Sequence, residues 1–175
     1  MKIENIECLI IAIMLGLIFI LWFLKAITIT EVNTLDEMPS VYDLIFGVEI
    51  EINGYLNYEI DYQIRGMKWV FVFHLVAFVL ASLLTFEFSD EYRGCQIALF
   101  TLLIFAGVGF FVMMYSGITG FASALQLKAE NVKVGFAIWS SLIMYVFTVG
   151  IALYQLTKKI DVLYFEIKGV IRNIF

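Results

Sequence analysis

Residues 69–86 read WVFVFHLVAFVLASLLTF, a run without lysine, arginine, aspartate or glutamate that is bracketed by Lys68 and Glu87. The hydrocarbon core of a bilayer is about 30 Å thick, and an α-helix needs about 20 apolar residues to cross it. The run therefore predicts a membrane-spanning helix over about residues 68–87. Three further apolar runs predict spans over about residues 8–27, 95–118 and 134–157. The third run is longer than one crossing requires, because it stays uncharged from Cys95 to Leu127.

The composition of the whole chain is typical of a membrane protein. Of the 175 residues, 62% are hydrophobic and 15% are charged, and the mean hydropathy is +0.95. Soluble domains are usually about 45–50% apolar and about 25% charged, so a water-soluble globule is excluded. The net charge of −5 argues against a nucleic-acid partner, which requires a basic face. We expect a single four-span domain, residues 1–175, in a lipid bilayer.

A cleaved signal peptide is the rival interpretation of the N-terminal run, because Met1 and Lys2 precede it. The run is longer than the apolar core of about 7–15 residues that signal peptides carry. It also ends in Trp22-Phe23-Leu24-Lys25 and not in a small-residue cleavage site. We therefore interpret it as the first span.

Basic residues near the span ends predict the orientation, because they favour the cytoplasmic side. The tail, residues 158–175, holds four Lys and Arg residues, whereas residues 28–66 hold eight acidic residues and one basic residue, Arg65. We expect both termini to be cytoplasmic and residues 28–66 to be extracellular, although lysines near residues 128–133 weaken the contrast. The tail predicts either an amphipathic helix along the inner leaflet or a solvated helical end.

The predicted outer segment alternates between apolar and polar residues, which is typical of strands with one buried face. Residues 48–52 read VEIEI and residues 56–64 read LNYEIDYQI, with Asn53-Gly54, a strong hairpin signal, between them. We also expect a short strand at Val41–Phe46. Because a lone hairpin is marginal in water, the sheet is expected to have three or more strands.

The strand register follows from the requirement that apolar residues share one face. A three-residue loop with a bulge at Gly54 would set Ile50 opposite Leu56 and Val48 opposite Tyr58. A two-residue turn would set apolar residues opposite polar ones. We therefore predict the bulged loop.

His74 is the only histidine and lies within the second predicted span. An ionisable residue inside a membrane is a candidate functional residue. At helical spacing His74 shares a face with Ala77, Ala81 and Thr85, which predicts that it points into the bundle. We prefer a neutral imidazole bonded to a neighbouring helix over a proton or ligand role. A haem site would need a second axial histidine.

The acidic residues of the outer segment are a second candidate. Glu49, Glu51, Glu59 and Asp61 are candidate interaction residues together with Arg65. The acidic residues alternate with apolar ones as on a solvated strand face, which we prefer over a cation site with fixed ligands. Their negative potential would nevertheless concentrate cations.

No catalytic constellation, phosphate-binding loop or zinc pattern is present in the sequence. Cys8 and Cys95 are the only cysteines and lie at the predicted cytoplasmic ends of spans, which favours reduced thiols or acylation sites. We therefore expect a protein that is not an enzyme and that carries no cofactor and no metal.

The layout resembles the claudin-like tetraspan superfamily, which includes claudins, peripheral-myelin and epithelial membrane proteins, channel gamma subunits and the fungal tetraspans of membrane furrows. QIRGM at residues 63–67 looks like the Gln-x-x-Arg-Ala-Leu-Met junction of claudins, and FAIW at residues 136–139 resembles a stretch seen in several members. The family hallmark, Gly-Leu-Trp followed by two cysteines, is absent, because residues 28–66 contain neither Trp nor Cys.

This resemblance implies a plasma-membrane bundle of four transmembrane helices with a small extracellular antiparallel β-sheet between helices 1 and 2. The function it implies is lateral or cell-to-cell assembly, in a barrier, junction, adhesion or membrane-domain role, through self-association or another membrane protein. Two alternatives stay open. The protein is an auxiliary subunit of an ion channel or receptor, or it is a small transporter or pore lined by His74.

Overall fold

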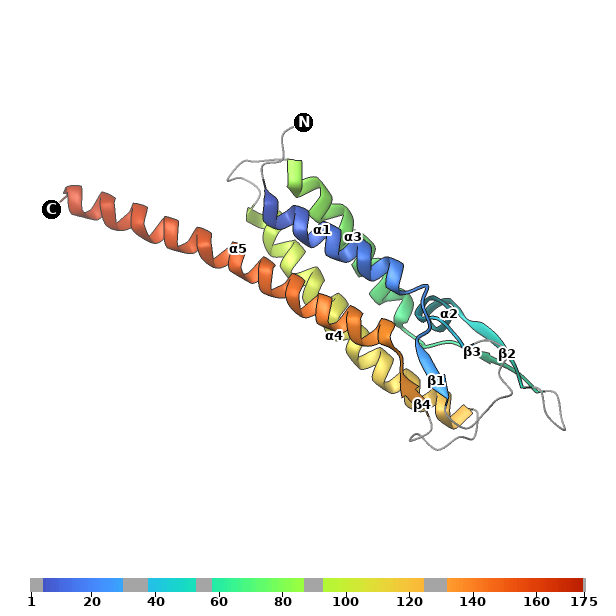
Figure 1. Cartoon of the computed structure of the whole chain (residues 1–175). Coiled ribbons are helices and arrows are strands. Elements are labelled where there is room, and N and C mark those ends of the chain that lie inside the picture. The colour runs from blue at the N-terminus through green and yellow to red at the C-terminus, as the bar shows by residue number, and fades with distance from the viewer. Residues whose placement is uncertain (1–4, 30–37, 53–57, 87–92, 125–131, 175) are drawn as a thin grey trace.

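The computed structural model describes residues 5–29, 38–52, 58–86, 93–124 and 132–174 (Figure 1). The described helices are α1 (Ile6–Leu21), α2 (Val41–Phe46), α3 (Met67–Phe86), α4 (Arg93–Ala124) and α5 (Phe136–Ile174). The described strands are β1 (Ile27–Ile29), β2 (Val48–Ile52), β3 (Tyr58–Tyr62) and β4 (Val132–Val134). The fold is therefore mostly helical, with short strands, as the sequence predicts.

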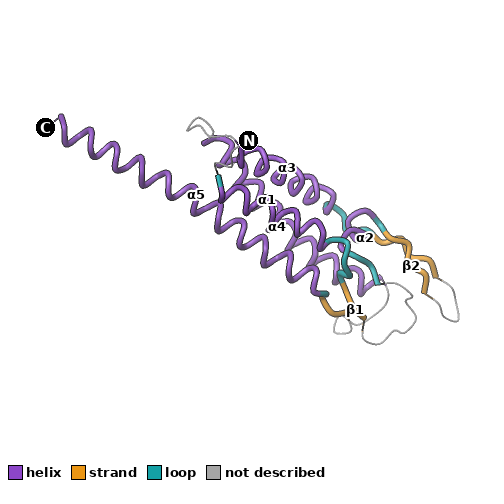
Figure 2. The backbone as a smooth tube through the Cα atoms, turned by 45° about the horizontal axis from the view of Figure 1, so that its top comes forward, coloured by secondary structure: helices purple, strands orange, loops and turns teal. Residues whose placement is uncertain are grey.

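Helices α1, α3, α4 and α5 form a four-helix bundle in which α1 and α4 each contact α3 and α5 (Figures 1 and 2). Three segments are long and apolar enough to cross a membrane, namely Met67–Phe86, Gly94–Ser123 and Phe136–Thr157. These segments correspond to the second, third and fourth predicted spans. Helix α1 is an apolar helix of 16 residues, shorter than the other three.

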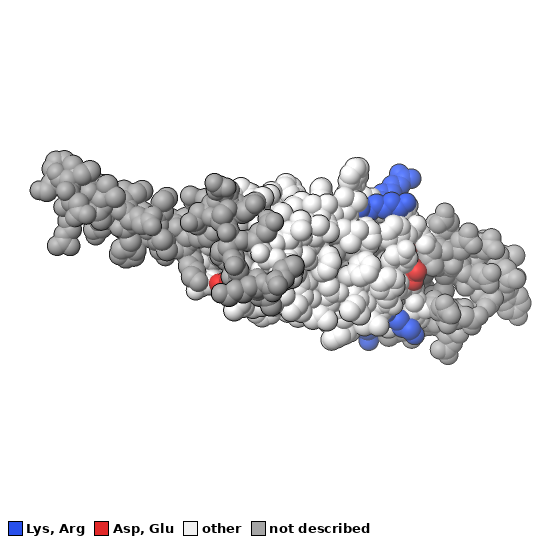
Figure 3. Space-filling view, turned by 90° about the horizontal axis from the view of Figure 1, so that it is seen from above, with Lys and Arg blue, Asp and Glu red and all other residues white. Residues whose placement is uncertain are grey.

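The strands and α2 lie at one end of the bundle, which we call the sheet end (Figure 2). The opposite end, where α1 begins and α5 extends past the other helices, is called the terminal end (Figure 1). On the face seen in Figure 3, the described surface between the two ends is a broad belt without charged residues. Four basic residues are exposed near the sheet end: Lys25, Arg65, Lys68 and Lys133.

The first predicted span is longer than α1, and the reason lies in the strand that follows it. The helix ends at Leu21, and Ile27–Ile29 then pairs antiparallel with Val132–Val134, with Ile27 opposite Val134. β-branched residues such as those of β1 suit a pleated strand. This small sheet joins the segment after α1 to the segment before α5, and the sequence analysis does not predict it.

The predicted strand at Val41–Phe46 is wrong, because these residues form α2. Ser40 and Asp43 make a capping box, in which Asp43 N donates to Ser40 Oγ over 3.1 Å and Ser40 N donates to Asp43 Oδ2 over 2.8 Å. These contacts satisfy donors that the first turn of a helix otherwise leaves unpaired. Val41, Leu44 and Ile45 then fall on one helical face and are buried in the bundle.

The predicted sheet of three or more strands is also wrong, because the described strands form two separate two-stranded sheets. In the hairpin formed by β2 and β3, Ile50 lies opposite Ile60 and not opposite Leu56. The prediction that apolar positions oppose apolar positions is correct. The residue opposite Ile50 lies four positions later in β3 than predicted, because the last described pair before the loop is Ile52 with Tyr58. The predicted bulge at Gly54 lies outside the described residues.

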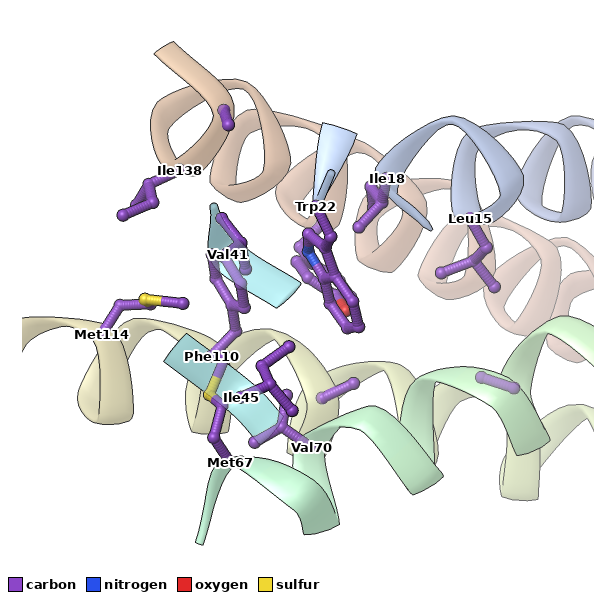
Figure 4. Close-up of a cluster of buried hydrophobic side chains, with 14 of the residues drawn as sticks. Leu15, Ile18, Trp22, Val41, Ile45, Met67, Val70, Phe110, Met114 and Ile138 are labelled. Atoms are coloured by element: carbon purple, nitrogen blue, oxygen red, sulfur yellow. The ribbon is translucent and has the colours of Figure 1, made fainter. Parts of the chain in front are cut away.

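The buried core runs along the inside of the bundle, from Cys8 and Leu84 at the terminal end to Val41 and Ile45 of α2 at the sheet end. Figure 4 shows Trp22 and Phe110 among aliphatic side chains from every helix. The labelled side chains around them are Leu15, Ile18, Val41, Ile45, Met67, Val70, Met114 and Ile138. Backbone bonds hold α2 against this core, because Tyr42 N donates to Trp22 O over 2.8 Å and Ala26 N donates to Pro39 O over 2.9 Å.

Candidate functional site

His74 lies inside the bundle on the face of α3 that the sequence predicts. Its side chain is 1% exposed, and Ala77, Ala81 and Thr85 on the same face are buried as well. Three small or polar residues at helical spacing let α3 approach its neighbours closely, as helix packing in membranes requires. The imidazole is therefore held among helices and away from lipid.

Both ring nitrogens of His74 have hydrogen-bond partners on other helices. Nε2 lies 3.1 Å from the carbonyl oxygen of Leu15 on α1, and Nδ1 lies 2.7 Å from the hydroxyl oxygen of Tyr145 on α5. A carbonyl oxygen can only accept, so Nε2 carries a hydrogen. In the neutral tautomer with that hydrogen, Nδ1 accepts from the Tyr145 hydroxyl. His74 thereby links α3 to α1 and α5, which is the kind of bond to a neighbouring helix that the sequence predicts.

Three aromatic rings surround His74 and each comes from a different part of the bundle. Trp22, directly after α1, has its ring centroid 4.7 Å from that of His74. Phe110 of α4 stacks on Trp22 with centroids 5.8 Å apart and an angle of 2°, and it also lies 5.7 Å from Tyr145. We call Trp22, His74, Phe110 and Tyr145 the central cluster. Residues of all four bundle helices or their caps thus meet at one point.

The central cluster has little capacity for proton chemistry. His74 contributes the only imidazole of this cluster, and both nitrogens of its ring are occupied by hydrogen-bond partners. The indole N–H of Trp22 is buried and has no acceptor among the described residues. Arrangement and burial therefore favour a packing role, in which two hydrogen bonds and stacked rings fix the positions of the helices.

A second polar cluster, the terminal clamp, consists of Asn5, Cys8, Thr85 and Gln155 and lies at the terminal end. Asn5 Oδ1 accepts from Cys8 N over 3.2 Å and from Gln155 Nε2 over 2.7 Å, and Asn5 N donates to the carbonyl oxygen of Thr85 over 3.4 Å. Asn5 thereby caps α1 and ties it to α3 and α5. The sequence signal was an asparagine directly before an apolar helix, which the sequence analysis missed.

The two cysteines differ in accessibility. Cys8 is completely buried in the terminal clamp, with its sulfur 3.3 Å from Gln155 Nε2, whereas Cys95 near the start of α4 is half-buried. Burial of Cys8 favours a reduced thiol, the first of the two alternatives that the sequence leaves open, at that residue.

The hairpin is attached to the bundle through the residues at and after the end of β3. The Tyr62 hydroxyl donates to the carbonyl oxygen of Gly117 on α4, Gln63 Nε2 donates to Ile45 O over 2.8 Å, and Ile64 N donates to Leu44 O over 2.9 Å. Burial raises the pKa of Tyr62, so its hydroxyl stays protonated and able to donate. These bonds hold one end of the hairpin against α2 and α4.

The five predicted interaction residues do not form a single cluster, because Arg65 lies apart from the four acidic residues of the hairpin. In the β2–β3 register Glu49 lies opposite Asp61 and Glu51 lies opposite Glu59, so the acidic positions form two facing rungs. The side chains of these four residues lie outside the described part of the structure. Arg65 is exposed between β3 and α3 and is not part of the ladder. Among the described residues there is no group of three or more potential metal ligands.

An apolar groove of about 560 Å³ lies between α4 and α5 on the outside of the bundle. Gly107 lies in the groove, and the rim includes Phe111, Trp139 and Val146, which are all exposed. The groove is lined by apolar and aromatic side chains, including Leu142 and Val149 of α5.

Comparison with known proteins finds no matching family model, no matching curated protein and no matching solved structure. The resemblance to claudin-like tetraspans therefore stays a prediction from sequence.

Proposed function

We propose that the protein is a non-enzymatic four-span protein of the plasma membrane that mediates lateral or cell-to-cell assembly through its hairpin. The observation that carries the proposal is the hairpin itself, which is bonded to the bundle at the β3 end. Within the described residues β2 and β3 pair only with each other, so each strand has one unpaired edge. Unpaired edges are templates for strand pairing with another chain.

The fourth span in this proposal is α1. At about 1.5 Å per residue its 16 residues are about 24 Å long, and a bilayer adapts to a short span by thinning locally. Helix α1 packs beside α3 and α5, and exposed Ile13, Leu17 and Ile20 give it an apolar outer surface. A helix with apolar residues on all sides is suited to a membrane interior.

The proposed orientation places the sheet end outside and the terminal end in the cytoplasm. Helix α1 begins and α5 ends at the terminal end, which supports the same side for both termini (Figure 1). The basic residues of the tail support the cytoplasmic side. Tags inserted at Asn53 and at the C-terminus should label from opposite faces of intact cells. Labelling of both tags from one face would contradict this topology.

A small pore lined by His74 has less support than assembly. The central cluster fills the inside of the bundle near the sheet end, and the His74 ring bonds to two helices instead of lining a path. The purified chain in liposomes is expected to conduct no ions, and His74→Ala is expected to change nothing in that measurement. A pH-dependent flux that His74→Ala abolishes would replace assembly with transport.

The assembly role is tested by removing the hairpin from the full chain. Replacement of residues 48–60 by a flexible glycine–serine linker leaves Tyr62, Gln63 and Ile64 in place and so preserves the bundle. We expect this variant to lose contacts between cells and cross-linked species larger than dimers, at unchanged expression and thermal stability. Assembly that survives the replacement would contradict the proposal. Purification at fixed stoichiometry with a larger membrane protein would instead favour an auxiliary subunit.

A further inference from the structure

Helix α5 is much longer than a membrane crossing requires. It runs without interruption for 39 residues, from Phe136 to Ile174, while its apolar spanning part ends at Thr157. The remaining residues, 158–174, continue the helix by about 25 Å past the ends of the other helices. Figures 1 and 2 show no other described element beside this extension.

The extension carries an apolar heptad repeat that begins inside the membrane part. Apolar residues recur at alternating spacings of three and four: Leu142, Val146, Val149, Leu153, Leu156, Ile160, Leu163, Ile167, Val170 and Ile174. We call these positions the α5 seam. A repeat of this kind is the pattern of a helix that packs against one or more partner helices in a coiled coil. The lysines, arginine and acidic residues of the extension lie at other heptad positions.

The geometry of the helix distinguishes between the two sequence-based predictions for the tail. A helix that lies along the inner leaflet has to bend sharply where it leaves the membrane. Helix α5 has no break at residues 157–159 and has no proline. It therefore leaves the bundle along its own axis, so the helix that bears the apolar heptad positions continues past the spanning part. An isolated helix of this length is marginal in water, so the seam requires a partner.

Inside the bundle the seam is not fully used by the chain itself. Val146 is 73% exposed and Leu153 is 49% exposed. Gly150 lies beside them on the exposed side of α5, and a Cβ at this position would meet nothing within 4 Å. Glycine in a helix interior costs about 1 kcal/mol relative to alanine, and contacts within the chain do not require it here. A glycine of this kind in a membrane helix allows a second helix to approach closely.

We propose that two copies of the chain pair in parallel along the α5 seam, with residues 158–174 forming a two-stranded coiled coil. The pairing is in register, because the bilayer holds both copies at the same depth and in the same direction. The heptad has isoleucine at each a position of the extension, Ile160, Ile167 and Ile174, and its d positions are Leu156, Leu163 and Val170. β-branched residues at a with leucine at d favour two strands.

Charges flanking the seam do not oppose this dimer. The e positions are Thr157, Tyr164 and Ile171, and none of them is charged. Lys159 and Glu166 at the g positions therefore meet no like charge in a parallel dimer, in which g of one helix faces e of the other. Because the seam is self-complementary, the second copy is the occupant that fits it, and the interface has two-fold symmetry.

Cysteine cross-linking of the full chain in lipid vesicles tests the pairing. In a Cys95→Ser background, single substitutions Ile160→Cys, Leu163→Cys and Ile167→Cys probe the seam, and Lys158→Cys and Arg172→Cys probe the opposite face. Mild oxidation should give several-fold more disulfide-linked dimer at the seam positions. Equal cross-linking at both sets of positions would overturn the proposal, and so would the absence of cross-linking at every position.

A second measurement is independent of cysteine reactivity. Ile160→Lys combined with Ile167→Lys should reduce the mass of the particle in mild detergent from two chains to one. The control Phe165→Lys lies at an f position, outside the seam, and should leave the dimer intact. Thermal unfolding of the bundle should not change in either variant. A double-lysine variant that stays dimeric would overturn the assignment, as would a wild-type chain that is monomeric. The hairpin replacement described above should retain this dimer, so failure of one proposal is distinguishable from failure of the other.

Discussion

The two ends of the bundle are joined in different ways. At the terminal end, side chains make most of the connections, with Asn5 bonded to Gln155 on another helix. At the sheet end, backbone groups make most of them, as where Gly135 N donates to Ala26 O over 2.7 Å and Ile64 N donates to Leu44 O over 2.9 Å. Helices satisfy their own backbone groups, so a few polar side chains suffice to link them. Where the chain leaves the helices, its backbone groups need partners on other segments.

This difference predicts different sensitivities. The sheet end depends on close approach of backbones, which an added methyl group prevents. A Cβ at Gly135 would lie 2.6 Å from the carbonyl oxygen of Lys25 and 2.7 Å from that of Ala26. The terminal end depends on pairs of polar side chains, so it is sensitive to the loss of one partner.

The largest expected effect is that of Gly135→Ala. Two backbone carbonyl groups would have to move, and the β1–β4 pairing beside them would be disturbed, which places the loss at about 3 kcal/mol, the upper end for overpacking. Gly94→Ala is the matched control, because a Cβ at Gly94 meets nothing within 4 Å. Thermal unfolding in detergent measures both variants. Equal stability of the two would show that the sheet end does not depend on this close approach.

The next largest effect is expected for Asn5→Ala at the terminal end. The substitution removes the cap of α1 and leaves the buried amide of Gln155 without its 2.7 Å partner, which should lower the free energy of unfolding by about 1–2 kcal/mol. Ser82→Ala serves as the control, because the Ser82 hydroxyl is bonded only to Phe78 O of its own helix. A loss no larger than that of the control would mean that the terminal clamp does not link the helices.

Features encoded in periodicity could be predicted from the sequence. Uncharged runs predict α3, α4 and the spanning part of α5, and helical spacing predicts the inward position of His74. Alternation predicts the hairpin and its parity. Each of these signals lies within a single segment, so no knowledge of distant contacts is needed.

Features that depend on distant segments could not be predicted in the same way. Strand β1 is only three residues long, and its partner β4 lies more than a hundred positions later in the chain. The residues that surround His74 come from three other parts of the chain, so Tyr145 and Trp22 could not be assigned to the site. The capping box of α2 was a local signal, but the apolar content of Val41–Phe46 favoured a strand.

A smaller effect is expected in the central cluster, which joins helices by the same means as the terminal end. Tyr145→Phe removes the hydroxyl that donates to His74 Nδ1 but preserves the ring contact with Phe110. Hydrogen bonds between membrane helices contribute about 0.6 kcal/mol on average, so the loss should be about 1 kcal/mol or less. A double-mutant cycle with His74→Phe isolates the pair. A coupling energy of zero would assign the stability of this region to packing alone.

The smallest effect on global stability is expected for Tyr62→Phe, because the bundle does not depend on the hairpin. The substitution removes the bond from the Tyr62 hydroxyl to Gly117 O and should loosen the β3 end, which faster hydrogen exchange in β3 would report. Burial raises the pKa of Tyr62 above its ordinary value of 10.0, so the neutral hydroxyl is the form that the fold stabilises. The contribution is therefore fully present below pH 10 and is lost as the pH rises through the raised pKa. Wild-type exchange in β3 should accelerate in that range, whereas Tyr62→Phe, which has no group to titrate at this position, should show no such step. The same step in both proteins would mean that another group attaches the hairpin to α4.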